Sequence, residues 1–159
     1  ILLLRNPIDR SHSQYQMELN KGNEELVSFE DAIEQEDKRI QGEYDKMLQN
    51  ENYYSKQYTI QSYITKSIYV NYIEEWLKYF PREQFLFLNS EEFNSDTSKV
   101  YKKTLNFLEI SEIDFKNYEV FRAAKYSEMN PSTRKKLSEF FKPYNEKLYK
   151  LIDQNFHWD

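Results

Sequence analysis

The segment "LLLRNPIDRSHSQYQ" (residues 2–16) decides how the rest of the sequence is interpreted. Its three leucines form a short apolar run, which is typical of a strand buried on both faces. Asn6 followed by Pro7 is typical of a capped helix start and predicts a helix from Pro7 to about Asn20. Arg5 therefore ends a buried strand, where its guanidinium needs an anionic partner. That partner is either a carboxylate of the same chain or a phosphate from outside.

Ser13 lies about two helical turns beyond the predicted helix start. A guanidinium offers a fork of donors and a hydroxyl offers one more, so Arg5 and Ser13 together can hold a phosphate monoester. Arg10 is expected to face the same way as Ser13, whereas His12 is expected to point elsewhere. The residues alone leave open whether Arg5 binds a phosphate or pairs with an internal carboxylate.

Composition limits the classes of function. The 159 residues are enough for one compact domain. The absence of cysteine excludes disulfides, zinc–thiolate sites and cysteine nucleophiles, and nothing visible requires a metal. A formal net charge of −5 argues against nucleic acid as a partner, and no apolar run is long enough to cross a bilayer. Residues 24–51 carry ten acids and three bases, which indicates a solvated helix face.

Local patterns predict the remaining elements. A capping box at Ser28 starts a long helix that reaches about Gln49, and apolar residues at four-residue steps predict a second long helix over residues 60–80. A strand follows at residues 84–89. Helix starts are then expected at Asp96 and at Asn130–Pro131, and residues 109–130 are expected to be irregular. Pro143 is expected to divide the last helical region in two.

Two strands separated by helices are a fragment of α/β architecture, and their corners at Arg5 and Asn89 are expected at one sheet edge, where ligands bind in open parallel sheets. Two strands make a poor sheet, and Ile1 lies within an apolar run. We therefore expect the chain to be the downstream piece of something larger. Glu91 and Glu92 follow the second strand, where they act either as a base or as favourable charge in a first helical turn.

At this point the sequence resembles a known family. "LRNPIDRSHSQY" (residues 4–15) resembles the 3′-phosphate-binding segment of sulfotransferases that use 3′-phosphoadenosine 5′-phosphosulfate (PAPS). Residues 62–93, 96–110 and 129–152 and the terminal "FHWD" resemble further segments of bacterial and heparan-sulfate-type members. The resemblance implies an α/β fold with a P-loop NTPase-like core, here a helix-rich fragment with about two parallel strands. Residues 1–159 would form a single domain, the C-terminal part of a sulfotransferase domain.

The resemblance implies transfer of a sulfuryl group from PAPS to a hydroxyl or amine of a carbohydrate, lipid or other acceptor, with 3′-phosphoadenosine 5′-phosphate (PAP) leaving. Arg5 and Ser13 would hold the 3′-phosphate of this nucleotide. Lys125 would reach a phosphate from the loop that closes over the nucleotide in the family. Lys66 and Tyr69 match the family's basic-x-x-Tyr pattern and would face the acceptor, although a tyrosine beside isoleucines also suits a core.

The sequence also departs from the family. A glycine-rich loop that holds the 5′-phosphosulfate is expected upstream, but the two glycines, Gly22 and Gly42, lie in helical surroundings. The catalytic base is unassigned, and we expect this piece to be inactive by itself. The alternative is a non-catalytic helical module that binds a partner through its acidic segment; a P-loop kinase relative would need the same absent loop. A bacterial cytoplasmic protein is expected, or a Golgi-lumenal one if the source is eukaryotic.

Overall fold

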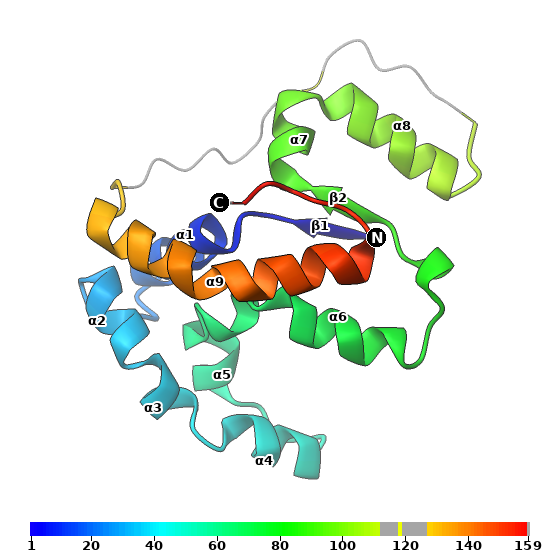
Figure 1. The fold of residues 1–159 in the computed structure, drawn as a ribbon. Helices are drawn as coiled ribbons and strands as arrows, with labels where there is room; N and C mark the ends of the chain where they lie inside the picture. The colour runs from blue at the N-terminus through cyan, green and yellow to red at the C-terminus, as the bar shows by residue number, and fades with distance from the viewer. Residues whose placement is uncertain (112–117, 119–126, 159) are drawn as a thin grey trace.

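The computed structural model describes residues 1–111, 118 and 127–158. A short parallel strand pair lies among its helices (Figure 1). Strand β1 (Leu2–Leu4) pairs with β2 (Phe87–Asn89), and Leu4 lies opposite Asn89. The prediction of two parallel strands is thus confirmed, and the corners after both strands share one edge. The second strand is shorter than predicted: residue 84 belongs to a 3₁₀ turn, η2 (Arg82–Gln84), and residues 85 and 86 connect this turn to β2.

Helices surround the strands, as Figure 1 shows. Helices α6 and α9 lie on one side of the strand pair, α7 and α8 lie on the other, and α2 to α5 extend away from it. In chain order the remaining elements are α1 (Pro7–Asn20), α2 (Phe29–Glu34), α3 (Glu36–Ile40), α4 (Glu43–Gln49), α5 (Lys56–Gln61), the 3₁₀ turn η1 (Thr65–Ser67), α6 (Tyr69–Leu77), α7 (Ser90–Ser95), α8 (Thr97–Phe107) and α9 (Pro131–Ile152).

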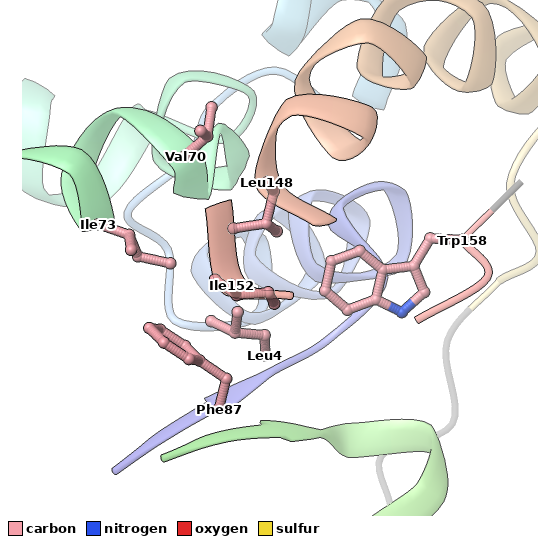
Figure 2. Close-up of a cluster of buried hydrophobic side chains, with 7 residues drawn as sticks. All are labelled: Leu4, Val70, Ile73, Phe87, Leu148, Ile152 and Trp158. Carbon is pink, nitrogen blue, oxygen red and sulfur yellow. The ribbon is translucent and has the colours of Figure 1, made fainter. Parts of the chain in front are cut away.

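Two buried clusters hold these elements together. The first lies between the strands, α6 and α9, and Figure 2 shows its side chains converging: Leu4, Val70, Ile73, Phe87, Leu148, Ile152 and Trp158. The second joins α1, α2 and α9 to the turn after α5: Ile8, Tyr15, Phe29, Ala32, Tyr63, Leu137 and Phe141. Removal of this apolar area from water is the main force that stabilises the fold.

The predicted helix starts are confirmed by their caps. The side chain of Asn6 accepts a hydrogen bond from the Ile8 amide at 2.9 Å, and Pro7 takes the first helical position. Asp96 caps α8, and Asn130 caps α9 by accepting from the Ser132 amide. These starts were predictable because a cap satisfies free amides only two or three residues away.

Both predicted long helices are wrong. The chain over residues 28–49 forms three short helices, and Gly42 between α3 and α4 adopts a left-handed φ of 74°. The chain over residues 60–80 breaks between α5 and α6. It breaks because the amides of residues 63–65 donate to the side chain of Glu36, so they are unavailable to the carbonyls of α5.

Two further expectations are corrected. Helix α9 runs unbroken through Pro143, because the burial of residues on either side, Phe141 and Leu148 among them, outweighs one lost helical hydrogen bond. Leu3 is 49% exposed, so β1 is not buried on both faces within the described part of the chain. Only Leu4 of this strand is fully enclosed.

Candidate functional site

Arg5 lies immediately after β1, at the carboxyl edge of the strand pair, and its side chain is exposed. The expectation that this side chain lies close to a buried core is therefore wrong, whereas the binding of an external phosphate by Arg5 stays a prediction. Among residues 1–111, 118 and 127–158, no carboxylate forms an ion pair with this guanidinium. The cation faces solvent at the edge where parallel sheets bind ligands.

The backbone beside Arg5 is held firmly although its side chain is exposed. The Tyr69 hydroxyl donates to the Arg5 carbonyl at 2.9 Å, and the Asn6 amide donates to Oε1 of Glu91 at 2.9 Å. Burial raises the pKa of Tyr69 to about 12, so its hydroxyl keeps its proton at neutral pH. Glu91 lies in the first turn of α7, as one of its two predicted roles requires.

Ser13 lies within α1, half-buried and two residues past the buried Ser11, so it occupies another side of this helix. The partners of Arg10 lie in the turn before α6. The Arg10 guanidinium donates to the Tyr63 carbonyl and to the Ser67 hydroxyl, each at 3.1 Å. Arg10 is thus engaged by the turn before α6 and takes no part in the strand-edge corner.

Lys66 and Tyr69 do not point to a common place. The Lys66 ammonium donates to the Thr59 carbonyl at 2.7 Å and lies 5.6 Å from the centre of the Tyr58 ring, so it faces α5. Burial, with the nearby Arg10 charge, lowers the pKa of Lys66. The structure therefore brings Tyr69 to Arg5 but leaves Lys66 apart. Lys125 lies outside the described residues.

A buried turn behind this corner was missed from the sequence. Both oxygens of the enclosed Glu36 accept backbone amides, those of Tyr63 and Ile64 at 2.9 and 2.8 Å and that of Thr65 at 2.8 Å. The Tyr63 carbonyl in turn accepts hydrogen bonds from Arg10, Ser11 and Ser67. No sequence signal separates Glu36 from the other acids of its segment.

The prediction of a solvated acidic face is wrong for Glu24, Glu36 and Glu43, which are buried. The Glu24 carboxylate accepts hydrogen bonds from both terminal nitrogens of the Arg39 guanidinium, at 2.6 and 3.1 Å, and from the Tyr63 hydroxyl at 2.9 Å. Burial alone disfavours its charge, but these hydrogen bonds prevail and hold the pKa of Glu24 below its usual value. Part of the acidic segment therefore stabilises the fold.

His12 lines a hollow of about 620 Å³ beside α1, together with Gln16, Phe29 and residues 127–131. Burial lowers the pKa of His12 despite the nearby acids Asp9 and Glu30, which favours a neutral ring at pH 7. Its ring nitrogen lies 3.2 Å from the Gln16 amide nitrogen, and no second histidine or carboxylate joins it in a metal-binding group among the described residues.

Comparison with known proteins identifies the fold. A family model described as the sulfotransferase domain matches residues 1–151. The chain belongs to the sulfotransferase family. Its fold is the P-loop-like α/β fold of that family: the crystal structure of a sulfotransferase from Alicyclobacillus acidocaldarius is similar with a TM-score of 0.71 and 27% identity, over 98% of this chain and 55% of that one.

Curated relatives agree with this assignment. The chain is 32% identical, over 60% of its length, to the membrane-associated sulfotransferase kil1 of Dictyostelium discoideum. It is 25% identical, over its whole length, to the heparan sulfate glucosamine 3-O-sulfotransferase 6 of Mus musculus. The chain spans 20% and 48% of the lengths of these two relatives. Among the helices described for this sulfotransferase chain, none is long and apolar enough to cross a membrane.

Proposed function

We propose that this chain supplies the 3′-phosphate-binding half of a PAPS-dependent sulfotransferase. The observation that carries the proposal is the exposed Arg5 at the carboxyl edge of a parallel strand pair, without an ion pair in the described part of the chain. Arg5 and Ser13 match the family's phosphate-binding spacing, and Lys125 would add a third contact. A guanidinium fork suits a phosphate monoester well.

The bound donor provides the sulfuryl group, which moves to a hydroxyl or amine of the acceptor as PAP leaves. In this proposal, Arg5 and Ser13 fix the position of the nucleotide and do not take part in bond making. Catalysis would rest on holding the reactants in line and on stabilising charge at the transferring group. The base that deprotonates the acceptor is unassigned, and we expect residues 1–159 alone to bind the nucleotide without turnover.

A carbohydrate is the first acceptor class to test, because a relative that matches the whole chain is named as a heparan sulfate glucosamine sulfotransferase. Lipids and other hydroxyl compounds are further acceptors in this proposal. The Tyr69 hydroxyl contacts the strand edge at the Arg5 carbonyl, whereas the Lys66 ammonium contacts the Thr59 carbonyl of α5. Of the two predicted acceptor residues, Tyr69 therefore has the better position. The formal net charge of −5 disfavours nucleic acid as an acceptor.

Thermal unfolding with two nucleotides tests the proposal. PAP and adenosine 5′-phosphate differ only in the 3′-phosphate, so we expect PAP to raise the melting temperature at concentrations where adenosine 5′-phosphate does not. If neither nucleotide stabilises the chain, the proposal fails and a non-catalytic helical module becomes the better account. Equal stabilisation by both would remove the 3′-phosphate from the explanation.

Arg5→Ala locates the site. We expect PAP affinity to fall by about 2–4 kcal/mol, as for a lost charge-assisted bidentate contact, with no change for adenosine 5′-phosphate. Lys150→Ala is the matched control, because it removes an exposed positive charge from the last turn of α9. Calorimetric titration of both variants measures the difference, and an unchanged PAP affinity in Arg5→Ala would exclude Arg5 from the site.

A further inference from the structure

The peptide bond between Arg5 and Asn6 is held at both of its polar atoms by side chains from distant parts of the chain. Its carbonyl accepts from the hydroxyl of Tyr69, 64 residues away, and its amide donates to Glu91, 85 residues away from Asn6. Side chains more often hold such groups at helix caps and turns, close in sequence. Here two separate elements, α6 and α7, converge on one peptide.

Trp158 connects these two side chains. Its indole nitrogen donates to Oε2 of Glu91 at 3.1 Å, and its ring centre lies 5.9 Å from that of Tyr69. Figure 2 shows the six-membered part of the indole facing Ile152 and Leu148, with the nitrogen on the far side. Both oxygens of Glu91 are therefore occupied, one by the Asn6 amide and the other by the indole.

The position of Trp158 is itself fixed. The Tyr149 hydroxyl accepts from the Trp158 amide at 2.9 Å, and the Trp158 carbonyl accepts from the buried Asn145 at 3.3 Å. Two residues before Trp158, the Phe156 carbonyl accepts a hydrogen bond from the Asn89 side chain at 3.3 Å. Figure 1 shows this last segment running beside the strands and ending near the carboxyl end of β1. The C-terminal segment thus supports the corner after β1.

We propose that Glu91, Tyr69 and Trp158 are positioning residues that fix the Arg5–Asn6 peptide so that the Arg5 guanidinium meets the 3′-phosphate of the nucleotide. This inference rests on the proposed function. An exposed arginine has many rotamers, and a fixed backbone lowers the entropy lost when its guanidinium is immobilised by a ligand. The three residues act through Arg5 and do not touch the phosphate.

The charge of Glu91 separates this role from a direct electrostatic one. A carboxylate near a phosphate site repels the ligand, so its removal strengthens binding if repulsion is its main effect. If Glu91 acts by positioning, its removal weakens binding. The sign of the change in Glu91→Gln is therefore informative, and we expect weaker binding of PAP.

Trp158→Phe keeps an aromatic ring in the core and removes the indole donor, together with part of the buried ring, without a change in charge. We expect its PAP affinity to fall about tenfold, as for other losses of an orienting partner, and its affinity for adenosine 5′-phosphate to stay within about twofold. Tyr69→Phe, which removes only the hydroxyl, is expected to behave in the same way. Trp76→Phe is the matched control, since Trp76 is an exposed tryptophan whose ring stacks on that of Phe80.

A double-mutant cycle decides whether the effect passes through Arg5. In the Arg5→Ala background, Trp158→Phe is expected to cause no further loss of PAP affinity. Equal losses for both nucleotides, a full further loss in the Arg5→Ala background, or unchanged PAP affinity in both Trp158→Phe and Tyr69→Phe would overturn the inference. If Arg5→Ala itself leaves PAP affinity unchanged, or wild type binds no PAP, the proposed function fails and the inference with it.

Discussion

Arg5 and Arg10 lie five residues apart, and the structure treats them in opposite ways. The Arg5 side chain is exposed while its backbone is held at both polar atoms by Tyr69 and Glu91. The Arg10 guanidinium donates to the turn before α6, and burial lowers its pKa from the usual value for arginine. The fold binds the backbone of Arg5 and leaves its guanidinium available for a ligand. In Arg10 the guanidinium itself is bound by the fold, so it is not available.

The same contrast separates the two surroundings. The polar groups of the turn around Arg10 are paired with one another by hydrogen bonds. Glu36 accepts from the backbone amides of the turn, and the Tyr63 carbonyl accepts from Arg10, Ser11 and Ser67. Such groups are costly to leave unpaired, so substitutions there are expected to affect stability. Substitutions of the Arg5 side chain are expected to affect ligand binding.

The largest effect is expected for Glu36→Ala, because it leaves three backbone amides, the buried one of Tyr63 and the partly buried ones of Ile64 and Thr65, without an acceptor. We expect the free energy of unfolding to fall by about 3 kcal/mol or more, since each unsatisfied donor costs about 1–3 kcal/mol. Chemical denaturation measures this loss. Asp37→Ala is the control, because Asp37 is the exposed acid next to it and is expected to change stability by less than about 0.5 kcal/mol.

Glu36 also shows why the sequence predicts some elements and not others. Helix starts at Asn6, Asp96 and Asn130 depend on groups two or three residues away, and all three were predictable. The break between α5 and α6 depends on a carboxylate 27 to 29 residues earlier in the chain. Apolar periodicity continues through that break, so the pattern alone predicts one long helix.

In the candidate site, too, some features were predictable from the sequence and others were not. The position of Arg5 at the strand edge was predictable, because parallel strands fix where their carboxyl ends lie. Its exposure was not, since it depends on how α6, α7 and the C-terminal segment pack around the corner. Tyr69 was singled out as an acceptor contact, but its hydroxyl donates to the Arg5 carbonyl, a partner 64 residues away. The roles of Ser13 and Lys125 stay predictions.

An exchange of each arginine for methionine tests the comparison directly. Methionine keeps much of the apolar stem and removes the charge and the donors. We expect Arg10→Met to lower the free energy of unfolding by about 2 kcal/mol through lost hydrogen bonds, and Arg5→Met to change it by less than about 0.5 kcal/mol. Chemical denaturation and calorimetric titration with PAP should rank the two variants in opposite orders; the same order in both measurements would contradict the division of roles.

The smallest expected effect concerns Glu24, which links the buried turn to Arg39. Its folded-state pKa lies below the ordinary value of 4.5, because burial is outweighed by hydrogen bonds from Arg39, the Leu26 amide and Tyr63. A depressed carboxyl pKa contributes stability that is present above about pH 4.5 and is lost as the pH falls through the folded-state pKa. Glu24 therefore makes the buried turn sensitive to acid.

Tyr63→Phe removes one of these hydrogen bonds and keeps the ring, so the pKa of Glu24 is expected to rise toward its ordinary value. The variant should be less stable than wild type at pH 7 by about 1 kcal/mol, and the difference should shrink as the pH falls below about 4.5 and Glu24 becomes protonated in both proteins. Glu30 and Glu92, whose pKa values are also lowered, are present in both and cancel in the comparison. Denaturation series across this range measure the difference, and a gap that stays constant with pH would show that Tyr63 stabilises the turn by packing and not through the charge of Glu24.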